Sequence, residues 1–331
     1  MWTGQVEPMP DNGPLVSFIV VTYKQERFVR EAVRSALAQD YHPLEIIISD
    51  DCSPDGTFGA IQEEVAAYTG PHRVVVHQNP MNLGLVGNLN EAWKLASGDF
   101  VVIQAGDDVS VPERVSEVVR CWLESGRTVD LVCSHFAEID ESGKATGVIK
   151  RNVVFLPDVN QDAAMWTCGA TGACAAYSRR IFEKYGPVDT RVLSEDWVYA
   201  FRAWVESGIK VVEKPLVLHR IHDDCLSVVY GRGVAGKEKR GARQKRRHRM
   251  ADSYVGISEN WLRAWELGPR GGDDRRRREL QKRVELGRME ADAFRASWLG
   301  GLRLTCAAFV RGGGFKRFSR MIAHHVVRYG Y

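Results

Sequence analysis

Two adjacent carboxylates, Asp107 and Asp108, stand in a short turn after the apolar segment Phe100–Ile103. Mg²⁺ and Mn²⁺ prefer such hard oxygen ligands, and enzymes usually hold them with one or two carboxylates plus water and substrate phosphates. The structural alternative is that Asp108 or Ser110 caps the helix that begins near Pro112. The pair is therefore a candidate metal site.

Two further acidic pairs carry possible chemistry. Asp50 and Asp51 end another apolar segment, where carboxylates can accept hydrogen bonds from a base imide or from ribose hydroxyls. The alternative for this pair is the hydrogen bonding of an Asx turn and a helix cap. Glu195 and Asp196 begin a helical segment, where one carboxylate could act as a general base toward a hydroxyl. The alternative there is that the helix dipole favours acids in the first turn.

The elements that must position these residues alternate regularly along the first half of the chain. Buried strands are predicted for Leu15–Val21, Leu44–Ser49, Arg73–His77 and Phe100–Ile103. Helices are predicted for Glu26–Gln39, Thr57–Tyr68, Leu85–Ala96 and Pro112–Glu124. This alternation predicts an α/β fold with a mostly parallel sheet and helices on both faces. Ligands of such sheets bind beyond the carboxyl ends of the strands, where Thr22, Tyr23 and the first two acidic pairs lie.

The second half follows a different pattern. Leu131–Ile139 and Val148–Phe155 flank a turn and predict an antiparallel excursion, and Thr171–Tyr177 is small and apolar. A helix is predicted for Ser194–Ser207, and short strands are predicted for Ile209–Val212 and Leu216–Ile221. Basic residues then crowd the chain, so we place a boundary near Tyr230. Residues 1–230 form the α/β domain in this division, and residues 231–331 form a basic, mainly helical region.

Five motifs in this order and spacing resemble glycosyltransferase family 2, the inverting enzymes of the GT-A fold. They are Val20–Glu26, Glu45–Thr57, Asn79–Gly84, Ala96–Phe100 and Gly106–Pro112. The resemblance runs from about Leu15 to about Val228. It implies a Rossmann-like GT-A domain with a donor half at about 15–110 and an acceptor half at about 111–230.

The resemblance assigns roles to residues of the donor half. Those implied to line the nucleotide sugar are Thr22, Tyr23, Glu26, Asp50, Asp51, Asn82, Gly84 and Asn88. Either Asp50 or Asp51 would read a uracil-type imide. Asp107 and Asp108 would hold Mg²⁺ or Mn²⁺ on the pyrophosphate. Ala105 stands where many family members carry a further acid, so Asp108 is favoured as the direct ligand.

The resemblance also covers two motifs of the acceptor half. Ser194–Trp197 resembles the family's acidic pair, whose Asp is the catalytic base, so Asp196 is assigned this role with Glu195 beside it. Inversion requires one displacement and a single base, whereas glycosidases need two carboxylates. His219–Ser227 resembles a late motif of the family. The resemblance implies that His222 ligates the metal or contacts a phosphate and that Arg220 contacts a phosphate. For His222, a surface or capping role is the alternative.

Other residues of this half keep two interpretations. The glycines of Gly169–Cys174 would let the backbone approach a sugar closely, or they belong to a buried strand of small residues. Trp166 and Trp197 would stack on an acceptor sugar, or they belong to the core.

The predicted activity is transfer of a sugar from a nucleoside-diphosphate sugar, with UDP as the default nucleotide, to a hydroxyl of a glycan or lipid-linked acceptor. A dehydrogenase acting on sugar nucleotides is disfavoured because no GxGxxG follows Val20. A nucleotidyltransferase is disfavoured because no Gly-rich basic loop follows the first strand. A non-catalytic relative that binds nucleotide or membrane is the remaining alternative.

Composition bounds the setting. The seven cysteines are an odd number without any CxxC pair, which argues against a disulfide framework or a zinc cluster. The N-terminus lacks the pattern of a signal peptide, and no window has the ~18 uninterrupted apolar residues of a membrane span. We therefore expect a cytoplasmic protein, peripheral at the inner face of the membrane if the basic segments touch lipid.

The basic segments are Lys237–Arg249 and Arg275–Arg278. A solvated helix face is the simplest interpretation, and attraction to anionic lipid is the next. The segment around Trp298–Arg311 looks amphipathic. Nucleic-acid binding is not expected, because the charge is not accompanied by a recognisable module. The sequence carries no signal for the oligomeric state.

Overall fold

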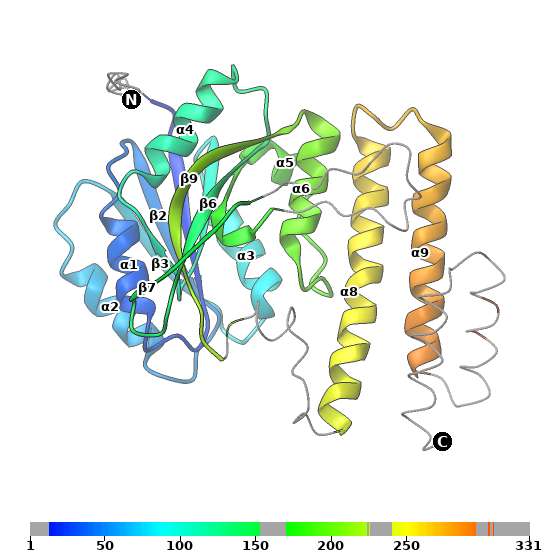
Figure 1. Cartoon of the computed structure of the whole chain (residues 1–331), viewed down its shortest axis with the longest axis horizontal. Coiled ribbons are helices and arrows are strands. Elements are labelled where there is room, and N and C mark those ends of the chain that lie inside the picture. Colours follow the sequence, from blue (N-terminus) through cyan, green and yellow to red (C-terminus); the bar gives the residue numbers. More distant parts are fainter. Residues whose placement is uncertain are drawn as a thin grey trace.

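The structure is a computed structural model that describes residues 13–152, 170–223, 225, 240–295, 304 and 307. Strands and helices alternate through the first half of the chain, as predicted (Figure 1). The elements in order are β1 Val16–Thr22, α1 Val29–Leu37, β2 Leu44–Asp50, α2 Thr57–Ala66, β3 Arg73–Gln78, α3 Gly84–Leu95, β4 Phe100–Ala105, β5 Val109–Ser110 and α4 Arg114–Glu124. The second half adds β6 Leu131–Ile139, β7 Ala145–Lys150, a short 3₁₀ turn at Gly172–Cys174, β8 Ala175–Ser178, α5 Arg179–Tyr185, α6 Glu195–Glu206 and β9 Ile209–Arg220.

These strands form one curled sheet in the order β3-β2-β1-β4-β8-β6-β9-β5, with β7 paired to β6. Neighbours among β3, β2, β1 and β4 are parallel, as are β6 and β9, whereas β5, β7 and β8 run antiparallel to their partners. Strand β5 follows β4 after a turn of three residues, yet it pairs with β9 at the other end of the order. The sheet therefore curls back on itself and brings the ends of β4 and β9 together.

The sheet has a core on each face because helices cover both. Phe18 and Val20 of β1 pack in one cluster with residues of α1 and α4. Ile19 and Val21 point the other way, into a cluster with residues of α3 and α6. Successive residues of a strand face opposite sides, which explains why β1 is a continuous apolar run rather than an alternating one.

Of the C-terminal helices, α8 (Arg240–Leu267) stands beside α6, and α9 (Asp274–Arg295) packs on the far side of α8 (Figure 1). Trp261 of α8 is fully buried and stacks on Phe201 of α6, with ring centroids 4.7 Å apart, and its indole N–H donates to the Trp197 carbonyl at 3.1 Å. Trp265 lies against Trp204 in the same way, at 6.2 Å. Helix α8 thus shares the core of the α/β domain. The boundary predicted near Tyr230 falls outside the described residues.

Two details of the second half differ from the predictions. The two short strands expected after α6 are one strand, β9, whose pairing with β6 shifts where Pro215 faces His135. Proline has no N–H to donate, which is why the ladder is irregular there while the strand continues. The small apolar segment is a 3₁₀ turn followed by β8 rather than one strand. Trp166, Gly169 and most of the amphipathic C-terminal segment lie outside the described residues.

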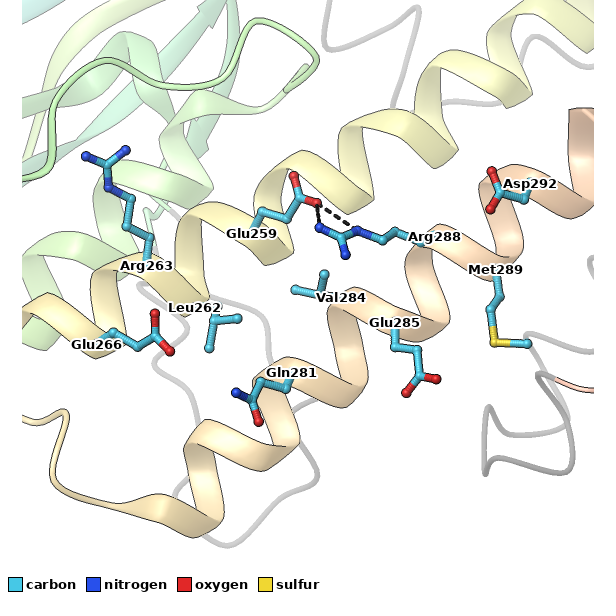
Figure 2. Close-up of a pocket in the computed structure, with 10 residues that line it drawn as sticks. All are labelled: Glu259, Leu262, Arg263, Glu266, Gln281, Val284, Glu285, Arg288, Met289 and Asp292. Atoms are coloured by element: carbon cyan, nitrogen blue, oxygen red, sulfur yellow. Dashed lines mark hydrogen bonds and ion pairs between the residues drawn. The ribbon is translucent and has the colours of Figure 1, made fainter.

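An open groove of about 430 Å³ runs between α8 and α9 (Figure 2). Its apolar side chains include Leu262 and Val284, and Glu259 pairs across it with Arg288 at 2.6 Å. None of the predicted site residues lines this groove. No helix in the described part of the chain is both long and apolar enough to cross a membrane.

Candidate functional site

The turn between β4 and β5 carries Asp107 and brings it close to the residues that follow β9. Its Oδ2 lies 3.0 Å from Nε2 of His222, which follows β9. The Asp107 side chain is 13% exposed, and the His222 ring lies against Phe28 with centroids 4.8 Å apart. The curl of the sheet therefore brings together an oxygen and a nitrogen donor that are 115 residues apart in the chain.

Asp108 has a different environment. It is fully buried, and its Oδ1 accepts a hydrogen bond from the Arg220 backbone N–H at 3.0 Å and faces Nδ1 of His219 at 3.0 Å. Burial opposes a charge on His219, but the Asp108 carboxylate outweighs it and raises the pKa of His219 to about 11. Asp108 thereby fastens the end of β9 to the turn, and it is Asp107 that lies beside His222.

The guanidinium of Arg220 is engaged in the chain itself. Its Nε donates to the Asp107 carbonyl at 3.0 Å, and its Nη1 donates to the carbonyls of Asp140 and Glu141 at 3.2 Å. Nη2 pairs with Glu31 of α1. Arg220 therefore ties α1, the β6–β7 turn and the Asp107 turn together, and it would have to leave these partners to contact a phosphate.

Asp51 organises the loop that follows β3. Its carboxylate accepts the backbone N–H groups of Leu83 and Gly84, each at 2.8 Å, and the Asn79 side-chain amide at 2.9 Å. Gly84 has a φ of +77°, a conformation that glycine adopts without steric cost. Asn82 adds a hydrogen bond of 3.3 Å to the Asp51 carbonyl. The loop predicted to lie near the pyrophosphate is therefore built around Asp51.

Asp50 organises the ends of β1 and β2. It is fully buried and accepts the hydroxyl groups of Thr22 at 3.0 Å and Ser53 at 2.6 Å. The other predicted donor residues lie around it. Asn88 accepts the Ser49 hydroxyl at 2.6 Å, Glu26 accepts the Gly56 N–H at 3.1 Å, and Tyr23 is 40% exposed after β1. These contacts shape the edge of the sheet and leave Tyr23 at its surface.

The turn that bears Asp107 meets the end of β1 at Gly106. Its N–H donates to the Val21 carbonyl at 2.9 Å, and a Cβ built on Gly106 would lie 2.6 Å from the methyl carbon of Thr22. A side chain does not fit at this position, because real Cβ contacts are not that short. The turn that bears Asp107 therefore rests directly on the end of β1.

Glu195 and Asp196 occupy the first turn of α6. Asp196 accepts the Trp197 N–H at 2.9 Å and the Gly172 N–H from the 3₁₀ turn. Burial raises the pKa of Asp196 to about 6, and burial together with the neighbouring Asp196 raises the pKa of Glu195 to about 8. The two carboxyl groups titrate as a pair, and both hold a proton more strongly than free carboxyl groups do.

The 3₁₀ turn connects this acidic pair to the turn that bears Asp107. The guanidinium of Arg114 donates to the carbonyl of Ile103 in β4 at 2.7 Å and to the carbonyl of Ala173 at 2.8 Å. The sequence pattern assigned no role to Arg114, because a lone basic residue has no pattern that distinguishes it from a surface one, and it included His219 only as the first residue of the His219–Ser227 motif. The donor loops, Asp107 and Asp196 thus lie on contiguous elements at one edge of the sheet.

Known proteins resemble this chain in sequence. The sequence profile of "Glycosyl transferase family 2" matches residues 17–186. "Putative glycosyltransferase EpsE" of Bacillus subtilis (strain 168) is 30% identical over 221 residues, which are 65% of this chain and 75% of that protein.

Two solved structures share the fold at low identity. TarS residues 1–349 of S. aureus, solved with UDP, has a TM-score of 0.58 at 14% identity, covering 96% of this chain and 92% of that one. The Pyrobaculum calidifontis mannosyltransferase PcManGT, solved with GDP-Man and Mn²⁺, has a TM-score of 0.55 at 19% identity, covering 97% and 88%. The profile match, the EpsE relative and the curled α/β sheet agree: this chain belongs to glycosyltransferase family 2 and is a glycosyltransferase of the GT-A fold.

Proposed function

We propose that the chain is an inverting transferase that moves a sugar from a nucleoside-diphosphate sugar to an acceptor hydroxyl, with Asp196 as the general base. The observation that carries this proposal is the half-buried Asp196 carboxylate, held by the N–H groups of Trp197 and Gly172, on the same sheet edge as the Asp107–His222 pair. UDP is the default nucleotide. TarS was solved with UDP, whereas the mannosyltransferase was solved with GDP-Man, so both diphosphates belong in a donor screen.

Asp196 suits the role of general base because of the orientation of its carboxylate and because of its pKa. Hydrogen bonds from Trp197 and Gly172 hold the carboxylate, and the raised pKa gives it affinity for a proton near neutral pH. It takes the hydroxyl proton as the acceptor oxygen bonds to the anomeric carbon and the bond to the diphosphate breaks. Attack opposite the leaving group inverts the configuration in this single displacement. Glu195 keeps its proton at neutral pH and adds no second charge beside the base.

The Asp107–His222 pair fits a divalent cation. The carboxylate oxygen suits Mn²⁺ or Mg²⁺, and the imidazole nitrogen 3.0 Å from it offers a second ligand to a transition metal ion. No group of three or more His, Cys, Asp or Glu that could hold a metal is found among the described residues, so pyrophosphate oxygens and water would complete the shell. A cation bound there would supply positive charge to the departing diphosphate. Asp108 then acts through His219 and Arg220 by holding the end of β9 in place.

The nucleotide is proposed to lie over the ends of β1, β2 and β3. Tyr23 offers the base an exposed ring, and the loop held by Asp51 offers the backbone and side chain of Asn82 and Gly84 to the ribose and pyrophosphate. The buried residues Asp50, Thr22 and Asn88 support this surface from beneath, and the exposed Glu26 accepts the Gly56 N–H beside it.

The acceptor is proposed to be a glycan or lipid-linked glycan reached at a membrane surface. The described part of α8 begins with a basic stretch that includes Lys245 and Arg249, and residues 296–331 contain six Lys or Arg and no Asp or Glu. In Figure 1 the start of α8 and the end of α9 lie on the same lower side as the end of β9. Clustered positive charge attracts anionic lipid, by about 1 kcal/mol per residue near the surface.

A transfer assay with single-site variants tests the proposed function. Nucleoside-diphosphate release from a panel of UDP and GDP sugars is measured with Mn²⁺ and candidate acceptors. Asp196→Asn keeps the shape of the side chain and removes the base, so acceptor-dependent turnover should fall by about 10²–10⁴-fold. Asp189→Asn is the matched control, because Asp189 lies in the loop before α6 and pairs with Arg191. Unchanged transfer by Asp196→Asn would refute the assignment of the base.

A further inference from the structure

Arg114, the first residue of α4, is a fully buried cation. None of its hydrogen bonds in the described part of the chain goes to a carboxylate: Nη2 donates to the carbonyls of Ile103 and Ala173, and Nη1 donates to the Ser110 hydroxyl at 2.9 Å. Its Nε is buried and has no hydrogen-bond partner among the described residues. Burial lowers the pKa of Arg114 to about 10, which leaves the guanidinium charged at neutral pH.

A charge in this position is costly to the fold. Removing a guanidinium from water carries a penalty of several kcal/mol, and well-packed apolar side chains of similar volume are often at least as stable. The neighbouring Asp108 carboxylate favours the charge only in part. Stability alone therefore does not account for an arginine here, and its contacts indicate what else it does.

The contacts of Arg114 span the two halves of the site. Ile103 and Ser110 lie on either side of the turn that bears Asp107 and Asp108, so Arg114 holds both ends of that turn. The third partner is the Ala173 carbonyl, next to Gly172, whose N–H donates to the Asp196 carboxylate. A Cβ built on Gly172 would lie only 3.0 Å from Oε1 of Glu195, which shows how closely the 3₁₀ turn fits the acidic pair.

We propose that Arg114 is a positioning residue that fixes the spacing between the Asp107–His222 pair and the Asp196 carboxylate. The inference rests on the proposed function, since it assumes that Asp107 serves the leaving diphosphate and Asp196 serves the attacking hydroxyl. A displacement requires these two groups in line, and a misplacement of about 1 Å can lower a rate about 10²-fold. Arg114 does this from beneath the site, through backbone carbonyls, without touching either substrate.

The test compares Arg114→Lys with Arg202→Lys. Arg202 is a matched control because it is also a buried arginine that donates to a backbone carbonyl, that of Gly186 at 2.8 Å, and burial lowers its pKa to about 10 as well. Lysine keeps the charge but has a single nitrogen, so it lacks the planar fork whose two arms reach the Ser110 hydroxyl and the two carbonyls at once. We expect Arg114→Lys to lower kcat by about 10–100-fold and to leave both KM values within about twofold of the wild type. Arg202→Lys should keep the wild-type kcat.

The pH profile of kcat is a second measurement, and a simple loss of stability would not change it. The Gly172 N–H lowers the pKa of Asp196, so loosening the 3₁₀ turn should shift the acidic limb of the kcat profile of Arg114→Lys to higher pH. A kcat loss no larger than that of Arg202→Lys, or a raised KM at unchanged kcat, would overturn the proposal.

A second variant covers the case in which Arg114→Lys does not fold. Gly172→Ala adds a methyl group to the 3₁₀ turn, close to Glu195, so it should also lower kcat at constant KM. A folded Gly172→Ala variant with wild-type kcat would overturn the inference. The proposed function is tested independently of Arg114, because full transfer by Asp196→Asn would refute it whatever the result for the Arg114→Lys variant.

Discussion

The environment of Asp196 predicts an unusual pH dependence of transfer. Burial raises its pKa to about 6, and the base works only when ionised. The kcat of transfer should therefore rise about tenfold per pH unit below about pH 6 and level off above it. An ordinary aspartate, with a pKa of about 3.9, would keep kcat constant down to about pH 5.

The size of the effect follows from the shift. At pH 5, one unit below the pKa, only about a tenth of the molecules carry the ionised base, so kcat should be about a tenth of its plateau. The neighbouring Glu195 titrates higher, at about 8, and is protonated throughout this range. Glu195→Gln should therefore keep the limb near pH 6, which separates the two members of the pair.

The assay measures nucleoside-diphosphate release at saturating donor and acceptor from pH 4.5 to 8, at constant ionic strength, and tryptophan fluorescence confirms that the protein stays folded over the same range. The reasoning would be refuted by a limb near pH 4. It would equally be refuted by a limb near pH 6 that disappears in Glu195→Gln, because Glu195 would then be the base.

Two further predictions concern the C-terminal helices. Trp261→Ala removes a buried ring that stacks on Phe201, so the free energy of unfolding in urea should fall by about 3–5 kcal/mol. Leu267→Ala, at a side chain 48% exposed, should lower it by less than about 1 kcal/mol. Equal small losses would contradict a core shared by α6 and α8. The protein should sediment with vesicles that contain phosphatidylglycerol, and it should be released as salt rises above about 0.15 M. Binding of the same strength to neutral phosphatidylcholine vesicles would argue against an electrostatic contact.

Much of the fold was predictable because its strands carry strong local signals. β1 and β2 are buried on both faces, which produces continuous apolar runs, and the motifs at their ends fixed the fold class. The continuity of β9 was missed because Glu213, Lys214 and Pro215 interrupt its apolar pattern, while the pairing that holds it together comes from β6, far away in the sequence. The packing of α8 was missed for a similar reason, since its many basic residues obscure Trp261 and Trp265.

The site was predictable in its residue types but not in its contacts. Strand ends in a parallel sheet gather at one edge, so Asp50, Asp51, Asp107 and Asp108 were found as candidates, whereas Glu195 and Asp196 were found from the family resemblance. Which member of the Asp107–Asp108 pair faces His222 depends on how β9 docks on the turn, and the sequence contains no signal for it. The same docking occupies the guanidinium of Arg220, which the sequence suggested for phosphate. Arg114 acts through backbone carbonyls, and such contacts leave no pattern of residue types.

Calorimetric binding of the nucleoside diphosphate selected by the donor screen, with and without Mn²⁺, tests the central claim most directly. If Asp107 and His222 hold the cation on the diphosphate while Asp196 serves only the acceptor, Asp107→Ala and His222→Ala should lose the Mn²⁺-dependent part of the affinity, and Asp196→Asn should keep it. Equal Mn²⁺-dependent affinity in all three variants, or its loss in Asp196→Asn alone, would contradict this division of the site.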